Sequence, residues 1–248
     1  TATHPDHQGQ GWFRRLTLHG LDALAEEGVE VVFNTPNDAS RPGYLSMGWT
    51  EQARLTAWVK VRRPTALLRL WRSRVPADLW PIVADERSPR EVGRPAPLAF
   101  ADQDALAAAL REAARSLPNS TGAATARGPA YYRWRYGLDA LGYHVVSDDE
   151  GLEAGFAVVR PRRRGMVSEL AILDIVTTPD RANRLVRRAL QFGDCDHAIV
   201  LGPRPGPTWF RAPGLGPRLV GRAVPGGIDP SGPVPSTWVL RLGDVELL

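Results

Sequence analysis

The stretch Gln8-Gly9-Gln10-Gly11-Trp12-Phe13 lies where a polar segment gives way to a sequence with helical apolar periodicity. Glycines let a backbone approach a ligand closely, and the first-turn amides of a helix, with its dipole, attract pyrophosphate. A Gly-x-Gly sequence before a helix is weakly specific, because a plain turn accounts for it equally well. The residues C-terminal to the loop must therefore decide between an anion site and a turn.

The residues after the loop predict a helix, a strand, a second short helix and a second strand. Apolar periodicity predicts a helix from Phe13 to Glu27, which Gly28 ends, and a buried strand over Val29 to Phe33. A short helix is expected around Ala39 to Met47, and alternation from Glu51 to Val61 predicts one long strand. Loop, helix and strand in this order are half of a parallel α/β unit.

A second spacing comes after the first strand. Asn37 is followed by Ser40 three residues later, Tyr44 seven later, and Gly48-Trp49 eleven and twelve later. This arrangement resembles the GNAT N-acetyltransferase superfamily, whose loop Gln/Arg-Gly-x-Gly-x-Gly/Ala precedes a helix, a strand and Asn-x-x-Ala-x-x-x-Tyr-x-x-x-Gly-Phe. Two matched spacings in the right order are much more specific than either one.

The resemblance implies an α/β (α+β) fold with a mixed, mostly antiparallel sheet flanked by helices, and transfer of an acetyl group from acetyl-CoA to an amine by direct attack. In this sequence it implies that backbone amides of the loop hold the CoA pyrophosphate and that Ala2 and Thr3 pair with the pantetheine. It also implies that Asn37 and Ser40 line the cofactor arm. The implied cofactor-binding residues are Ala2, Thr3, Gln8, Gly9, Gln10, Gly11, Trp12, Phe13, Asn37 and Ser40.

By the same resemblance, Tyr44 stands near the thioester sulfur as the catalytic general acid. A phenol with a pKa near ~10 can protonate a departing thiolate of slightly lower basicity. An alternative interpretation is that Tyr44 only closes a helix in the core. The sequence departs from the family pattern at Phe13, where a small residue is usual, and at Ser40, where alanine is usual.

The front of such a fold has no counterpart before the loop, so we expect two copies of which the first is incomplete. Residues 1–75 would be the C-terminal half of an N-terminally truncated GNAT domain, 76–100 a Pro-rich connector, and 101–248 a second, degenerate GNAT-like domain. Thr3-His4-Pro5-Asp6 recurs as Thr177-Thr178-Pro179-Asp180, at an offset of 179 − 5 = 174, followed by the same order of elements. The second copy has no glycines at this place, which favours a structural or acceptor-shaping role.

The second half predicts further elements. They are helices over Asp102 to Ser116 and Arg181 to Phe192, and strands over Tyr143 to Ser147, Glu153 to Val159, Val167 to Val176, His197 to Leu201 and Thr237 to Leu242. Asp148 to Gly151 and Arg162 to Gly165 are expected to be turns. The run Tyr131 to Tyr136 favours a helix start or a strand that packs Trp134 inward over stacking on single-stranded nucleic acid.

Composition limits the remaining function classes. With 31 basic and 27 acidic residues the net charge is only +4, which does not indicate a nucleic-acid partner. Cys195 is the only cysteine, and His4 and His7 have no third ligand nearby, so we expect no metal. No apolar stretch of about 20 residues predicts a membrane partner, and a cytoplasmic location is the default expectation.

The expected partner is a small-molecule or peptide amine acceptor, whose identity the sequence does not give. The alternative from another class is a non-catalytic CoA-binding or scaffold protein, favoured by the incomplete first copy and the glycine-free second copy.

Overall fold

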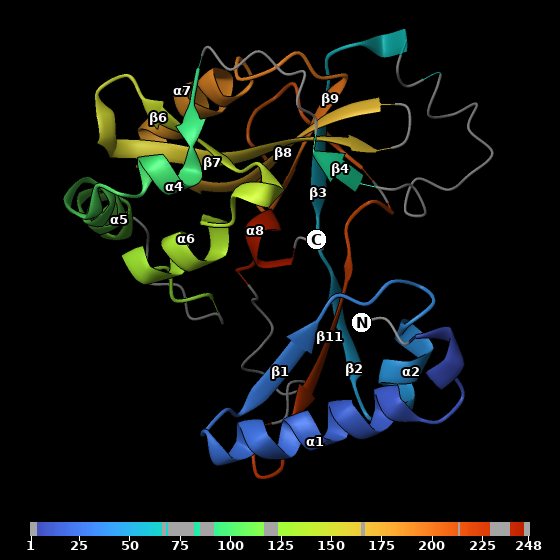
Figure 1. Ribbon diagram of the computed structural model, residues 1–248. Helices are drawn as coiled ribbons and strands as arrows, with labels where there is room; N and C mark the ends of the chain where they lie inside the picture. Colours follow the sequence, from blue (N-terminus) through green and yellow to red (C-terminus); the bar gives the residue numbers. More distant parts are fainter. Residues whose placement is uncertain are drawn as a thin grey trace. The chain divides into compact units, whose positions relative to one another are not determined.

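The computed structural model describes residues 4–65, 68, 82–84, 92–116, 124–164, 167–212, 214–228 and 239–245. They form two compact units (Figure 1). Unit 1 consists of Thr1–Leu55 and Gly216–Trp238, and unit 2 consists of Thr56–Leu215 and Val239–Leu248. The chain therefore passes between the units three times, and neither unit is one continuous segment. This grouping differs from the predicted segments 1–75, 76–100 and 101–248.

The described residues of unit 1 form a three-stranded antiparallel sheet with two helices. The strand order is β1-β11-β2, with β1 over Val31–Asn34, β11 over Arg218–Ala223 and β2 over Thr50–Arg54. The other elements are a 3-10 turn η1 (Pro5–His7), helix α1 (Trp12–Glu26) and helix α2 (Arg41–Ser46). The middle strand thus comes from the far end of the chain: Thr50 and Gly221 pair although 171 positions separate them.

The core of unit 1 forms between α1, α2 and β11. Helix α1 contributes Leu21, and the segment after α2 contributes Met47 and Trp49, while β11 contributes the fully buried Val220. Partly buried Leu18 and other apolar residues of α1 pack against this cluster, which is the face that its helical periodicity predicts. Burial of β11 in this cluster makes the strand part of the core as well as of the sheet.

Unit 2 contains an eight-stranded sheet in the order β10-β3-β9-β8-β7-β6-β5, with β4 pairing β7. Among the strand pairs that the structure describes in this sheet, β8 and β9 alone run parallel, and the crossover between them is helix α7. The strands are β3 (Ala57–Val61), β4 (Ile82–Ala84), β5 (Arg94–Pro95), β6 (His144–Asp148), β7 (Gly151–Arg164), β8 (Val167–Val176), β9 (His197–Leu201) and β10 (Phe210–Arg211). The sheet is therefore mixed and mostly antiparallel, as expected.

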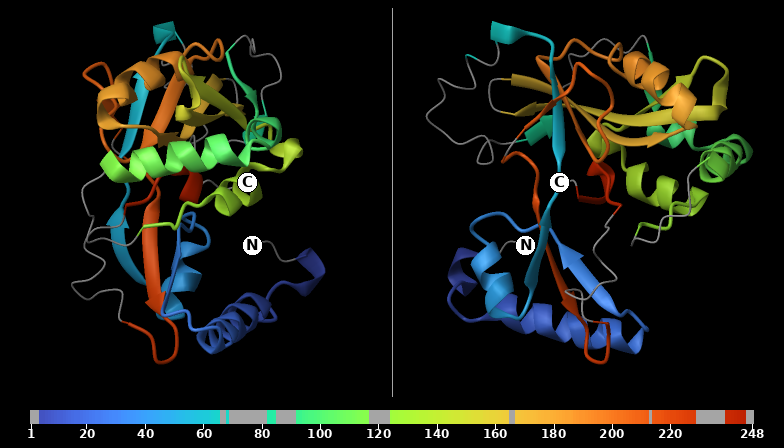
Figure 2. Two further views of the ribbon diagram at one scale, coloured as in Figure 1. Left: turned by 90° about the vertical axis from the view of Figure 1, so that its left-hand side faces the viewer. Right: turned by 180° about the vertical axis from the view of Figure 1, so that it is seen from behind.

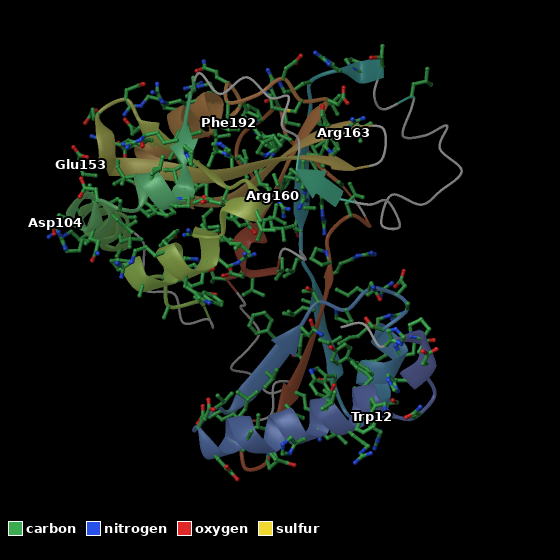
Figure 3. All side chains as sticks on the ribbon, viewed as in Figure 1. Trp12, Asp104, Glu153, Arg160, Arg163 and Phe192 are labelled. Atoms are coloured by element: carbon green, nitrogen blue, oxygen red, sulfur yellow. The ribbon has the colours of Figure 1, made fainter. Side chains whose placement is uncertain are left out.

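Helices cover both faces of this sheet. Figures 1 and 2 show α7 on one face and α5, α6 and α8 on the other. The core under α7 includes Leu185, Ala189, Ile172 and Phe192, of which Phe192 is labelled in Figure 3. The helices are α4 (Ala96–Ala99), α5 (Gln103–Ser116), α6 (Pro129–Tyr136), η3 (Asp139–Leu141), α7 (Pro179–Ala189) and α8 (Leu242–Val245).

Two sequence predictions were wrong because a pattern continues through a structural break. The long strand predicted over 51–61 is two strands, β2 and β3, which belong to the sheets of different units. Apolar residues alternate with other residues on both sides of the break between Arg54 and Ala57. This alternation alone therefore cannot reveal the break. The turn predicted at 162–165 is wrong for Arg162 to Arg164, because β7 extends through Arg164 and pairs there with β4.

Two further predictions concern aromatic and C-terminal segments. Trp134 was expected to pack inward, but it is 76% exposed, and Tyr132 and Tyr136 take the inward positions of α6 instead. The strand predicted over Thr237 to Leu242 is wrong at its end, where Leu242 begins α8. Residues 237 and 238 lie outside the described residues.

The sheet order makes a test of unit 1 possible. A fragment of residues 1–75 contains β1 and β2 but lacks β11, the strand that pairs with both. We expect this fragment to show no cooperative thermal unfolding by circular dichroism, because its two strands have no ladder between them.

A matched fusion supplies the missing strand. Residues 1–55 joined through a Gly/Ser linker to 216–238 should regain a cooperative transition. Cooperative melting of the 1–75 fragment by itself would contradict the role given to β11.

Candidate active site

The loop before α1 has the backbone geometry that two glycines allow. Gly9 and Gly11 both have φ in the left-handed region, at +73° and +74°. A Cβ built at either position meets nothing within 4 Å, so lack of space does not explain glycine there. The conformation does, since other L-residues adopt it only at a cost. The glycines thus set the path of an exposed backbone.

The first turn of α1 has free hydrogen-bonding capacity. The first helical bond is Arg15 N–H to the Gly11 carbonyl at 3.0 Å, so the amides of Trp12, Phe13 and Arg14 have no acceptor within the helix. Among the described residues, no side chain caps this turn. Exposed amides at the positive end of a 15-residue helix form a favourable environment for an anion.

Side chains around the loop hold one another. The Trp12 indole N–H donates to Gln10 Oε1 at 3.0 Å, and the Arg15 guanidinium lies 4.7 Å from the centre of a Trp12 ring. Trp12, labelled in Figure 3 at the start of α1, is 39% exposed. Arg14 donates to the Ser46 carbonyl at 3.4 Å and so ties the loop to the end of α2.

Tyr44 lies on α2 between two other rings. Its ring centre is 5.2 Å from that of Phe13 at the start of α1 and 5.3 Å from that of Trp49, both edge-on. Gly43 permits the first contact, because a Cβ there would approach Phe13 to 3.0 Å. The phenol is half-buried, and no described residue hydrogen-bonds its hydroxyl. The structure thus brings together the loop and the tyrosine that the sequence pattern singles out.

Asn37 and Ser40 bind each other. The Asn37 side-chain oxygen accepts from the Ser40 amide at 2.8 Å and from the Ser40 hydroxyl at 2.9 Å. The Asn37 carbonyl also accepts from the Arg41 amide at 2.9 Å, which starts α2. These bonds orient the helix that carries Tyr44. Their suggested contact with a cofactor arm stays a prediction, and Ala2 and Thr3 lie outside the described residues.

The loop histidine His4 contacts two neighbours in the sequence, Asp6 and His7. The His4 Nδ1 atom lies 3.4 Å from the amide of Asp6 and 3.6 Å from its carboxylate, and the His4 and His7 ring centres are 5.9 Å apart. Within the part of the chain that the structure describes, no group of three or more His, Cys, Asp or Glu side chains is arranged to hold a metal ion.

The crossover helix of unit 2, α7, begins without the glycine loop that precedes α1. Asp180 lies in the first turn of α7, where the neighbouring Thr178 side chain and the first backbone amides of the helix lower the pKa of its carboxyl group, with Arg181 adding to the effect. The helix start therefore carries its own carboxylate. A cavity of about 600 Å³ beside it is lined largely by acidic side chains: Glu112, Glu150, Glu153 and Asp180, together with Arg181, Ser116, Ala154 and Thr178. The acidic side chains at the start of α7 therefore disfavour the binding of a phosphate-bearing ligand there.

The aromatic run Tyr131 to Tyr136 serves packing in unit 2. Tyr132 and Tyr136 are fully buried against Phe100, and the Tyr136 hydroxyl donates to Asp174 Oδ2 at 2.5 Å. Burial, together with the neighbouring Asp174 carboxylate, holds the pKa of Tyr136 well above its ordinary value. Arg135 donates to the Gly243 carbonyl at 2.8 Å. The buried rings of Tyr132 and Tyr136 are therefore not presented for base stacking.

A buried ionic cluster that sequence patterns do not reveal lies beneath this run. Asp174 on β8 accepts from Arg241 at 2.9 Å, and Asp244 on α8 binds Arg127 and accepts from the Thr125 hydroxyl at 2.7 Å. Both carboxylates are inaccessible to solvent or nearly so. The cluster fixes the segment Val239–Val245 to unit 2. Its members are spread over more than a hundred positions, so no local spacing marks them.

The glycine geometry of the loop leads to a paired prediction on stability. Gly11→Ala should lower the free energy of unfolding by about 1–2 kcal/mol, because alanine strains the left-handed conformation. Gly20→Ala lies in the interior of α1, where a Cβ also meets nothing within 4 Å, and should raise it by up to about 1 kcal/mol. Urea denaturation measures both, and equal effects would contradict the assigned loop conformation.

Comparisons with known proteins agree with this geometry. The family model described as "Acetyltransferase (GNAT) domain" matches residues 1–51, which include the loop, α1, β1 and Tyr44. No curated protein matches the sequence significantly.

Solved structures match over most of the chain. A GCN5-related N-acetyltransferase from Anabaena variabilis ATCC 29413 has 16% identity and a TM-score of 0.50, with 89% of this chain and 53% of that chain covered. A protein of unknown function from Enterococcus faecalis V583, described as a probable N-acyltransferase, has 16% identity and a TM-score of 0.50, with 90% and 53% covered.

At this identity the likeness concerns the fold. The chain spans about half the length of these two structures. Residues 1–51 carry the sequence signature of the GNAT domain, and the mixed, mostly antiparallel sheets with flanking helices are those of its solved relatives. Residues 1–51 are therefore similar in sequence to the GNAT domain, and the chain is similar in fold to solved GNAT N-acetyltransferases.

Proposed function

We propose that the protein is an N-acetyltransferase that transfers the acetyl group of acetyl-CoA to an amine, with unit 1 as the donor site. The observation that carries the proposal is the contact between Phe13, which ends the glycine loop, and Tyr44, with ring centres 5.2 Å apart. It joins a site suited to a pyrophosphate to a phenol suited to proton donation. Both lie in the segment that matches the GNAT domain.

The donor would be held by its pyrophosphate at the start of α1. The fit rests on the positive φ of Gly9 and Gly11, on the exposed loop and on the amides of Trp12 to Arg14, which lack helical acceptors. The bulky Phe13 does not block this site, because its ring turns toward Tyr44 and Gly43 and leaves its amide in the first turn. Its departure from the family pattern is therefore compatible with anion binding.

The acceptor amine would attack the thioester carbonyl carbon in its uncharged form. As the carbon–nitrogen bond forms and the carbon–sulfur bond breaks, the electron pair goes to sulfur, and the Tyr44 hydroxyl would donate its proton to the thiolate. The proton that the acylated nitrogen releases would pass to solvent, and solvent would return a proton to the Tyr44 phenolate. The half-buried ring is held between Phe13 and Trp49, while no described residue hydrogen-bonds the hydroxyl. A fixed ring with an available hydroxyl is what a general acid requires.

Unit 2 would bind no second CoA, since Asp180 already supplies a carboxylate to the start of α7 and acidic side chains line the cavity beside it. Calorimetric titration of the protein in its full natural length with CoA should therefore give one site per chain. Absence of any binding would overturn the proposed function, and two sites would overturn the exclusion of unit 2.

Tyr44→Phe tests the acid directly. The phenylalanine ring preserves both edge-on contacts and removes only the hydroxyl. We expect kcat with a panel of primary amines to fall by about 100-fold, which lies within the usual contribution of a general acid. The KM for acetyl-CoA and the melting temperature should stay close to those of the wild type.

Unchanged turnover in this variant, with CoA still bound, would exclude Tyr44 as the acid. CoA binding by the wild type without transfer to any amine would favour the alternative function, a non-catalytic CoA-binding scaffold.

A further inference from the structure

Arg222 lies on β11 of unit 1, in the part of the chain far from the segment that matches the GNAT domain. Its guanidinium carbon is 5.1 Å from the centre of a Trp49 ring, a cation–π distance. The same guanidinium donates to the Met47 carbonyl through Nη1. The Arg222 side chain therefore contacts both the C-terminal end of α2, at Met47, and the Trp49 ring that follows it.

Trp49 depends on these ring contacts for its orientation. It is 4% exposed, and no described residue accepts a hydrogen bond from its buried indole N–H. A buried tryptophan usually obtains such a partner, which then fixes its rotation. Here the guanidinium of Arg222 and the ring of Tyr44 are the groups that contact the indole.

The contacts lead step by step to Tyr44. The Trp49 amide donates to the Tyr44 carbonyl at 3.2 Å, and the two ring centres are 5.3 Å apart. The Met47 amide donates to the same carbonyl at 3.0 Å. Arg222 thus contacts Met47 and Trp49, whose amides both donate to the Tyr44 carbonyl.

We propose that Arg222 is a positioning residue for Tyr44, which it orients through Trp49 and the Met47 carbonyl. The inference rests on the proposed function of Tyr44 as general acid. Guanidinium is suited to this task because it is planar, can lie over an indole ring and still donates from its edge. Arg222 would touch neither substrate and would act only through the tyrosine.

The same strand offers a matched control. Arg218 begins β11, is 37% exposed in its side chain and forms an ion pair with Glu51 at 3.7 Å. Arg222→Met and Arg218→Met both replace a β11 arginine by an unbranched apolar side chain. Arg222→Lys keeps the charge but loses the planar guanidinium.

The test measures kcat, the KM for acetyl-CoA and CoA binding in the protein of full natural length, for these variants with and without Tyr44→Phe. Arg222→Met should lower kcat roughly tenfold to a hundredfold, since small misplacement of a reacting group has effects of this size. CoA affinity should change by less than about twofold, and Arg222→Lys should recover part of the loss. Arg218→Met should leave kcat near the wild-type value.

The double variant separates positioning from a general structural effect. If Arg222 acts through the Tyr44 hydroxyl, Arg222→Met has no further effect on kcat once Tyr44 is phenylalanine. Equal losses in both backgrounds, or CoA affinity that falls together with kcat, would overturn the proposal.

A readout without turnover keeps this inference separate from the proposed function. The Tyr44 ring signal, identified in an NMR spectrum of ring-labelled tyrosine by its loss in Tyr44→Phe, should shift in Arg222→Met and stay in place in Arg218→Met. An unmoved signal would overturn the positioning role. Failure of the wild type to bind CoA or transfer acetyl groups would instead overturn the proposed function.

Discussion

The hydrogen-bond ladder that β11 makes on both of its edges is the constraint on which unit 1 depends. Strand β1 (Val31–Asn34) pairs with one edge of β11, and β2 (Thr50–Arg54) pairs with its other edge. In the sheet, β1 and β2 are therefore joined through β11. Val220 on the same strand is fully buried in the core. The local motif that identifies the family therefore has its position in space fixed by residues about 170 positions away.

The candidate site shows how a few ring contacts can join elements that have separate backbones. Phe13, Tyr44, Trp49 and Arg222 contact one another in turn at centre distances of 5.1 to 5.3 Å and connect α1, α2 and β11. Each contact contributes only about 0.5–1.5 kcal/mol. Their contribution to the site is orientation, because contacts with Phe13 and Trp49 hold the half-buried Tyr44 ring between them.

Local patterns predicted local structure well and long-range structure poorly. Helix α1 and strands β8 and β9 were predicted within a residue or two, and the loop spacing indicated the same family as the family model. The break between β2 and β3 was missed because alternation persists on both sides of it. Nothing near Tyr44 in the sequence points to Arg222, and the Asp174–Asp244 cluster likewise unites distant residues. Contacts between residues so distant in the sequence depend on the order in which the strands pair. The periodicity of apolar residues does not encode that order.

The threefold passage of the chain between its units has a consequence for synthesis on the ribosome. Residues 1–55 emerge first, yet their sheet lacks its middle strand until 218–223 have been made. At about 5–20 residues per second this wait lasts roughly ten to thirty seconds, during which two strand edges stay unpaired. Most of unit 2 is translated within that interval. A delay in that interval would prolong the time for which the edges of β1 and β2 stay unpaired and open to aggregation.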